Sequence, residues 1–289
     1  MMPHAALSRA TIATLAFIGV SDLRAEQAQD ASAWKTVLHG AARLIAGAAH
    51  ESTDNVWLRA GIEIRLDPGW HTYWRYPGDS GVPPTFDFGG SENVKSVTVL
   101  WPAPKRFVDS AGGHSIGYFG DVVFPLRITA SDKAKPSLLH VKLGYAVCGK
   151  FCLPAEANLE LTLSNKGDAE EPALVAAEAR VPRRVRLGVG VGLAIRSVHR
   201  EASEGRQRVV VEVATPEGTP LDLLVEGPTP DWALPSPELM DPAATSASGM
   251  RRFTVDLDGM PPGAHADGAT LTFTVVSPDE AIEVSADID

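Results

Sequence analysis

The 289-residue sequence contains only two cysteines, and its eight histidines are scattered without a ligand pair at helical or hairpin spacing. It also lacks a zinc motif, a phosphate-binding glycine loop and a serine nucleophile elbow, which argues against the common enzyme classes that use them. Acidic residues outnumber basic ones by 36 to 26, giving a net charge of -10. This excess argues against nucleic acid or an anionic membrane surface as a partner.

Long apolar runs are also scarce. The clearest one, Ala10–Val20, is roughly 11 residues long, which is too short for a helix that spans a bilayer. Arg9 precedes it and a small-residue cleavage site follows at residues 23–25, so we expect a signal peptide over residues 1–25, with an uncleaved anchor as the alternative. The mature chain is then expected to be periplasmic, not itself transmembrane, and in a compartment where disulfides persist.

Helical patterns are rare, whereas strand patterns recur throughout the chain. Apolar residues alternate with polar ones from Val56 to Leu66, which is typical of a half-buried strand. Similar runs, separated by Gly/Pro/Asp turns, fall into two series. The first comprises residues 37–45, 94–100, 122–128, 138–147 and 159–163, and the second residues 193–198, 209–213, 221–225, 253–257, 271–276 and 282–284.

Two series of short strands predict an all-β protein with two immunoglobulin-like β-sandwich domains in tandem, although a barrel in either half is an alternative. The expected domains cover residues 33–165 and 188–289. Residues 166–187 form the predicted linker between them, with one short helix from Glu170 to Arg180 that Pro182 ends.

The two cysteines, Cys148 and Cys152, are four residues apart at the end of a strand-like run. In an extended strand such residues lie about 13 Å apart, at a rise of about 3.3 Å each. A disulfide requires Cα atoms about 4.4–6.8 Å apart, so the chain must reverse between them if they are bonded. Gly149 permits unusual backbone conformations, and Pro154 disfavours continuation as a central strand.

Three roles are open to this pair. As a structural staple it would contribute about 2 kcal/mol by loop entropy, before strain in the small ring is subtracted. As a redox pair it would exchange electrons with other thiols, and Lys150 between the sulfurs would favour a thiolate. As soft ligands the thiolates would suit copper(I). The spacing excludes the thioredoxin motif, which has two intervening residues in a βαβ context.

Three segments resemble one known family. They are GWHTYWRYPGD at 69–79, WPAPKRF at 101–107 and YAVCGKFCLP at 145–154. Together they resemble the N-terminal periplasmic domain of the DsbD/ScsB thiol:disulfide interchange proteins, from about residue 35 to about residue 165. The second half resembles the extra immunoglobulin-like domain of ScsB-type members.

The resemblance implies that Cys148 and Cys152 are the catalytic redox pair of a protein-disulfide reductase component and that no cofactor is needed. It implies a membrane thiol–disulfide transporter or thioredoxin-like domain as the electron donor. The clients would be periplasmic thioredoxin-fold proteins, including cytochrome c maturation factors. The chain ends at Asp289 with no transmembrane or thioredoxin-like region, so we expect a separate donor or a free-standing variant.

The sequence departs from the best-known members in two ways. Those members have five residues between the cysteines, whereas this chain has three. They also cover the disulfide with an aromatic cap loop, whereas the matching stretch, Val108–His114, has no aromatic residue. We expect Phe107, Tyr118 or Phe119 to supply the cover if there is one.

Five further residues are candidates near the site. His71 and Tyr73 match positions of family tyrosines, and His71 could shuttle a proton. His114 lies in a glycine-rich loop, while Lys150 and Phe151 lie between the cysteines. The alternative for Tyr73 and its neighbours Trp70 and Trp74 is plain packing.

The second half offers no chemistry of its own. Its proline-rich stretch, residues 227–237, is predicted to be a surface loop and a possible docking surface. Sequence alone therefore favours a periplasmic thiol–disulfide carrier. The alternatives are a copper-binding protein that uses the same thiols and an interaction module with a structural disulfide.

Overall fold

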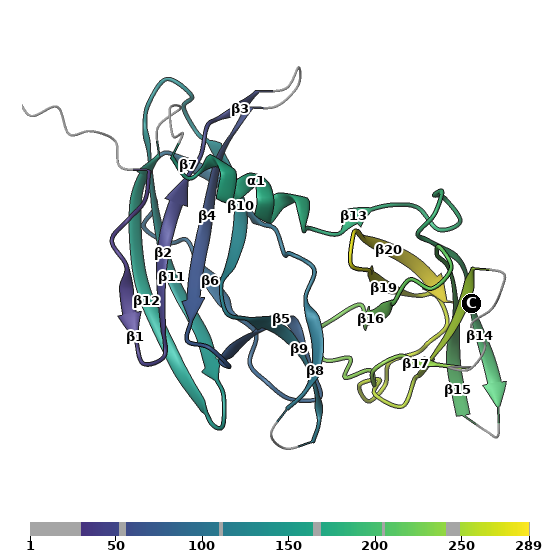
Figure 1. The fold of residues 1–289 in the computed structure, drawn as a ribbon. Helices are drawn as coiled ribbons and strands as arrows, with labels where there is room; N and C mark the ends of the chain where they lie inside the picture. Colours follow the sequence, from purple (N-terminus) through teal and green to yellow (C-terminus); the bar gives the residue numbers. More distant parts are fainter. Residues whose placement is uncertain are drawn as a thin grey trace, which may run out of the picture.

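The computed structural model describes residues 30–51, 56–109, 112–163, 169–203, 206–240 and 249–288. The predicted signal peptide lies outside these residues. The described chain consists of four antiparallel or mixed sheets and one helix, arranged as two β-sandwiches (Figure 1). This confirms the predicted all-β, immunoglobulin-like class. No helix among the described residues is both long and apolar enough to cross a membrane.

The first sandwich packs two six-stranded sheets face to face. Each sheet has five strands in a continuous order and one short strand paired to its side. One sheet runs β1 (Lys35–Val37), β2 (Gly40–Ala46), β4 (Val56–Leu66), β10 (Val122–Ala130) and β7 (Val94–Val99), with β3 (His50–Glu51) beside β4. The other runs β12 (Cys152–Leu163), β11 (Ser137–Cys148), β5 (His71–Gly78), β9 (His114–Phe119) and β8 (Lys105–Val108), with β6 (Thr85–Asp87) beside β11.

The predicted alternation in β4 places one set of its side chains in the core. Ile62 and Ile64 are fully buried there with Phe124 and Trp74, and burial of such side chains contributes about 1.5–3 kcal/mol each. One predicted strand is different, because residues 37–45 contain a tight turn at Leu38 and His39 that separates β1 from β2.

The second sandwich packs two four-stranded sheets. Its core is separate and includes Phe273, Leu271 and Val211. One sheet runs β13 (Arg183–Arg184), β20 (Ala281–Ile288), β19 (Ala269–Val276) and β16 (Asp222–Glu226), and the other runs β14 (Ala194–Ser203), β15 (Arg206–Ala214), β18 (Met250–Asp256) and β17 (Glu238–Leu239).

Helix α1 (Glu171–Ala179) lies in the segment predicted as a linker, close to the predicted bounds, and packs on the outer face of the first sandwich. Its buried Leu174 fits over two glycines, because a Cβ atom added at Gly47 or Gly61 would lie 2.7 or 2.8 Å from a Leu174 methyl carbon. The helix therefore belongs structurally to the first sandwich.

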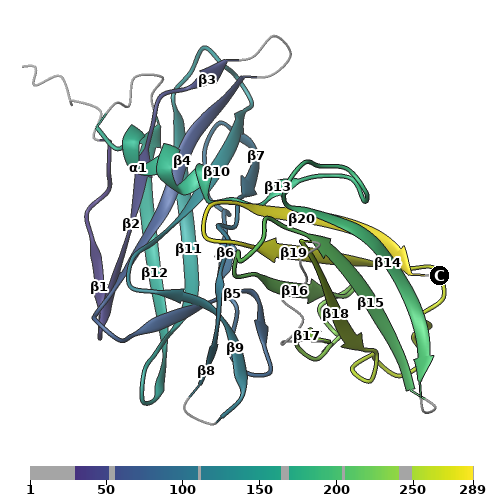
Figure 2. The same ribbon diagram turned by 45° about the vertical axis from the view of Figure 1, so that its right-hand side comes forward.

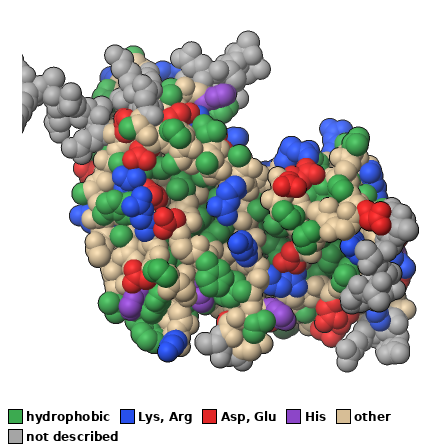
Figure 3. Space-filling view, viewed as in Figure 1, with side chains coloured by type: hydrophobic (Ala, Val, Ile, Leu, Met, Phe, Trp, Pro, Cys, Tyr) green, Lys and Arg blue, Asp and Glu red, His purple; other side chains and the backbone are tan. Residues whose placement is uncertain are grey.

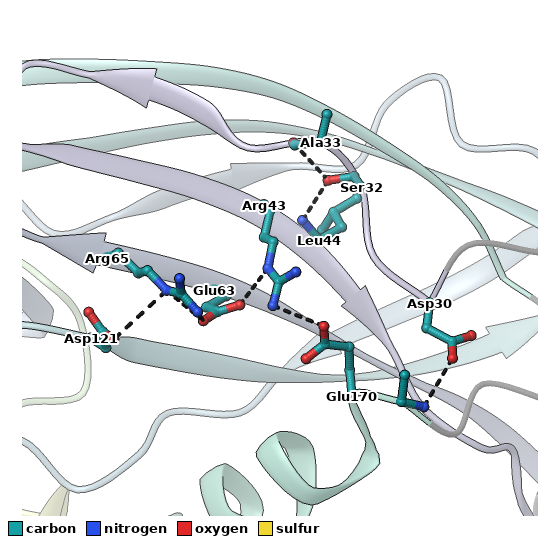
Figure 4. Close-up of polar contacts among 10 residues, drawn as sticks. Asp30, Ser32, Ala33, Arg43, Leu44, Glu63, Arg65, Asp121 and Glu170 are labelled. Carbon is teal, nitrogen blue, oxygen red and sulfur yellow. Dashed lines mark hydrogen bonds and ion pairs between the residues drawn. The ribbon is translucent and has the colours of Figure 1, made fainter.

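Ion pairs hold this segment to the sheet. Arg43 on β2 donates to Glu63 on β4 at 2.6 Å and reaches Glu170, just before the helix, at 3.0 Å (Figure 4). Arg59 on β4 makes a two-pronged contact with Glu178 at 2.7 and 3.1 Å. These arginine side chains are mostly buried, which strengthens such pairs relative to exposed ones.

The two sandwiches are in contact through the outer face of the β20–β19–β16 sheet, which lies beside the end of the first sandwich that contains β5, β8 and β9 (Figure 2). Leu224 of β16 is buried with the core of the first sandwich. A groove also runs between the lobes, with arginine side chains along both sides (Figure 3). Its lining contains Trp101, Arg75 and Arg184 but neither cysteine.

Candidate functional site

The two cysteines face each other across the end of a β-hairpin. Strand β11 ends at Cys148, strand β12 begins at Cys152, and the two residues are direct pairing partners. Their sulfurs form a disulfide, and their Cα atoms are 4.1 Å apart. The chain therefore reverses between the cysteines, as the distance argument required. Pro154 lies in β12, an edge strand, where a missing N–H does not interrupt the sheet.

Gly149 is needed for a different reason from the one the sequence suggested. It is not among the glycines with positive φ, so the turn does not depend on a glycine-only conformation there. Instead, a Cβ atom at Gly149 would lie 3.1–3.3 Å from the ring of Trp70. That ring is stacked on His39 at 3.9 Å and meets Phe151 edge-on at 5.4 Å. The turn is thus packed tightly against an aromatic neighbour.

The two sulfurs have unequal surroundings. Cys148 is fully buried, with Tyr73 and Ala146 around it, whereas Cys152 is an exposed residue. The Tyr73 hydroxyl donates to the Cys152 sulfur at 3.5 Å. Because a thiol–disulfide exchange partner must reach a sulfur atom directly, Cys152 is the accessible side of this bond.

His71 lies on β5 directly opposite Cys148 of β11. Opposite residues of an antiparallel pair project to the same face, so His71 is next to the buried cysteine. Its ring lies 4.6 Å from the Phe107 ring, and its Nε2 is buried without a hydrogen-bond partner. Burial lowers the pKa of His71, and the charge of Asp109 opposes that shift. The imidazole is therefore neutral at pH 7.

Two phenylalanines cover this side of the site. Phe107 of β8 and Phe119 of β9 contact each other at 4.7 Å and both contact His71. Tyr118, the third residue proposed as a cover, is instead buried in the sandwich core and donates to the Pro102 carbonyl at 2.8 Å. Within the described residues, the aromatic cover over His71 thus comes from strands β8 and β9.

A polar network fixes the β8–β9 hairpin beside this cover. Asp109 accepts hydrogen bonds from Ser115 at 3.1 Å and from the Gly113 amide at 3.0 Å, and it also contacts Ser80. Burial and the charge of Asp109 together raise the pKa of Tyr73. The sequence reading missed Asp109. Its position one residue after β8, at the start of a glycine-rich turn, was the available signal.

The other predicted site residues lie farther out. Lys150 and Phe151 are exposed in the turn between the cysteines, and Phe151 packs on Trp70. His114 starts β9 as an exposed residue, on the side of the first sandwich that faces Asp222 of the second. The structure therefore brings His71 and Tyr73 to the cysteines and places His114 toward the interface between the sandwiches.

Copper(I) binding is the alternative use of the two thiols. Across the described ranges, no group of three or more His, Cys, Asp or Glu side chains is arranged to hold a metal ion. The two sulfurs are bonded to each other in this structure.

Fold and site together define an immunoglobulin-like sandwich that carries a disulfide at the end of a β-hairpin. Residues 44–164 match the family model of the N-terminal domain of the thiol:disulfide interchange protein DsbD. The first sandwich, most of which this match covers, is similar to the DsbD N-terminal domain family. It is therefore a thiol:disulfide interchange domain with a cysteine pair.

Both sandwiches have a counterpart among solved structures. The crystal structure of the N-terminal periplasmic domain of ScsB from Proteus mirabilis aligns with a TM-score of 0.68 and 24% sequence identity. The alignment covers 90% of this chain and 98% of that one, so the fold is shared over nearly the whole length. Among curated protein sequences the chain has no significant match.

Proposed function

We propose that residues 33–165 form a periplasmic electron carrier that cycles between the Cys148–Cys152 disulfide and two thiols. The donor would be a membrane thiol–disulfide transporter or a thioredoxin-like domain, and the clients periplasmic thioredoxin-fold proteins. The periplasmic setting is supported by the likeness to a periplasmic domain and by the predicted signal peptide at residues 1–25. Residues 188–289 would form the second domain.

One observation carries this proposal: the disulfide joins an exposed cysteine to a buried one. A donor thiolate attacks the Cys152 sulfur, the Cys148–Cys152 bond breaks, and Cys148 leaves as a thiolate that takes up a proton. The donor's second thiol then attacks the donor sulfur that is bonded to Cys152 in the mixed disulfide. This releases Cys152 as a thiolate and leaves the donor oxidised to a disulfide.

The client step runs in the opposite sense. The Cys152 thiolate attacks a client disulfide, and one client thiolate leaves. Cys148 loses its proton and attacks the Cys152 sulfur of the mixed disulfide, which releases the second client thiolate and restores the bond. Two electrons and two protons reach the client in each cycle. Cys152 is thus the attacking residue and Cys148 the resolving one.

Single-cysteine variants test these roles. Cys148→Ser leaves the exposed sulfur without a resolving partner, so it should accumulate mixed disulfides with thioredoxin-fold proteins in periplasmic extract, identified by mass spectrometry. Cys152→Ser leaves only the buried sulfur and should trap at least tenfold less, and the double variant none. The proposal fails if neither single variant traps a partner, and the assigned roles are reversed if Cys152→Ser traps more.

A further inference from the structure

The second sandwich presents one face of strand β16 to the first. Leu223 and Val225 of β16 point into their own core, while Asp222, Leu224 and Glu226 alternate with them and point the other way. Leu224 is buried with the core of the first sandwich. The two acidic residues on either side of Leu224 form ion pairs with two arginines of the first sandwich, Arg106 and Arg75.

The side chain of Arg106 on β8 contacts the second sandwich. Its guanidinium donates to the carbonyls of Leu223 at 2.5 Å and Pro237 at 3.1 Å and pairs with Asp222 at 2.8 Å. The side chain is mostly buried, and its three contacts lie on two separate segments of the second sandwich. Such a forked, charge-assisted contact fixes direction as well as distance.

A second set of contacts holds strand β5. Arg75 makes a two-pronged contact with Glu226 at 2.6 and 2.8 Å and also reaches Glu283 at 2.6 Å. The neighbouring Tyr76 hydroxyl donates to the Leu234 carbonyl at 2.7 Å. The second sandwich therefore contacts both β5 and β8 through these side chains.

These are the strands that carry the surroundings of the disulfide. Phe107, which covers His71, directly follows Arg106 on β8, and successive residues of a strand point to opposite faces. Tyr73, which donates to Cys152, lies two residues before Arg75 on β5. Side chains of β5 and β8 thus contact Cys152 and His71, and neighbouring side chains of the same two strands contact the second sandwich.

Strand β8 has a clear need for support. It is four residues long and forms the edge of its sheet, paired with β9 alone. Short edge strands with few partners open locally at low free-energy cost. The loop after β8 contains no aromatic residue that could replace Phe107 as a cover. Because Phe107 lies on β8, its position depends on β8 staying in place.

We propose that the second sandwich is a brace for the aromatic cover of the disulfide, and that Arg106 is the positioning residue that transmits this support to Phe107. With the brace in place, Phe107 and Phe119 keep the buried Cys148 inaccessible, so that reagents and partners meet Cys152 alone. The functional benefit of this selectivity rests on the proposed exchange function. The contacts between the sandwiches and the shielding of Cys148 do not depend on that function.

The test measures the reactivity of each cysteine in the reduced full-length protein. Iodoacetamide alkylation is followed residue by residue by mass spectrometry, and amide hydrogen exchange reports on β8 and β9. In the wild type, Cys152 should react at least tenfold faster than Cys148. Arg106→Gln should raise the Cys148 rate at least threefold and speed exchange in β8 and β9, with β11 and β12 unchanged. Asp222→Asn should act in the same direction but less strongly.

Two further variants separate positioning from general destabilisation. Arg184→Gln removes another contact to Glu283, but the Arg184 side chain is 87% exposed and lies on β13, so both readouts should stay at wild-type values. Arg106→Lys keeps the positive charge but loses the forked contacts of the guanidinium. It should therefore shield Cys148 better than Arg106→Gln does, though less well than the wild type. Should Arg106→Gln fail to fold, Asp222→Asn and Arg106→Lys decide the question.

The brace is refuted if Arg106→Gln and Asp222→Asn, in folded form, alkylate Cys148 at the wild-type rate or leave exchange in β8 unchanged. Alkylation needs no protein partner, so this outcome is independent of the trapping experiment. Successful trapping with unchanged Cys148 reactivity would overturn the brace alone. Failed trapping with the expected change in Cys148 reactivity would overturn the exchange function alone.

Discussion

Tyr73 is the residue whose polar atom contacts the exposed sulfur. Its hydroxyl is 3.5 Å from Cys152, and in the reduced protein it can donate to the Cys152 thiolate. A hydrogen bond to a charged group contributes about 1.5–3 kcal/mol. Thiolate stability at Cys152 is therefore partly set by Tyr73.

We predict that Tyr73→Phe raises the pKa of the Cys152 thiol and slows its alkylation at pH 7 about tenfold, since 1.4 kcal/mol corresponds to a factor of ten. The rate is measured on the reduced protein. Tyr145→Phe is the control, because that buried hydroxyl has no hydrogen-bond partner and so donates to neither sulfur. Equal Cys152 rates in Tyr73→Phe and the wild type would show that the hydroxyl has no such role.

His71 makes the stability of the first sandwich depend on pH. Burial lowers its pKa in the folded state, so below the ordinary value of about 6.5 the unfolded chain binds more protons. The stability that neutral His71 contributes is therefore complete above pH 6.5 and declines as the pH falls. Among the described residues, Tyr73 and Asp109 are the titratable groups that face it, since the neighbouring Cys148 is held in the disulfide.

The corresponding prediction concerns His71→Gln. The loss in unfolding free energy caused by this substitution should be smaller at pH 5.5 than at pH 7.5, as measured by urea denaturation of the oxidised protein. Tyr145→Phe should cost the same at both pH values, because burial raises the pKa of that phenol to about 12. A His71→Gln effect that is equal at both pH values would contradict the linkage.

The β11–β12 hairpin is the element that brings the cysteines together, and its turn is packed against Trp70. We predict that Gly149→Ala destabilises the protein by about 1–3 kcal/mol, because the new methyl group would overlap the Trp70 ring. Lys150→Ala, an exposed change in the same turn, should stay within about 0.5 kcal/mol. Thermal or urea unfolding measures both, and equal stabilities would rule out this account of the glycine.

The strands that alternate or are wholly apolar could be predicted from sequence, and β4 has the predicted bounds. Strand β5 could not be predicted, because aromatic and polar residues are mixed along it. Trp74 packs in the core, Tyr73 lies at the cysteines, and Arg75 contacts the second sandwich. The cysteine pair and its reversal follow from spacing. The covering role of Phe107, the placement of His114 and the packing of Gly149 depend on contacts between residues distant in sequence.

Considered as a whole, the molecule places its chemistry in one sandwich and supports it with the other. The likeness to the Proteus mirabilis ScsB domain extends over both sandwiches, so the pairing of the two belongs to the shared fold. The proline-rich stretch at residues 227–237, predicted as a surface loop, contributes the Leu234 and Pro237 carbonyls that contact Tyr76 and Arg106. Within this chain it thus serves as part of the interface between the sandwiches.

We propose that Cys148 and Cys152 form a redox-active pair and not a purely structural disulfide. The most direct test is the reduction potential of the pair, measured by equilibrating the full-length protein with glutathione or dithiothreitol buffers. A carrier must both accept and release electrons, so we predict a potential above about -300 mV, in the range of known thiol–disulfide carriers. A potential well below about -300 mV would identify a structural disulfide and contradict the exchange function.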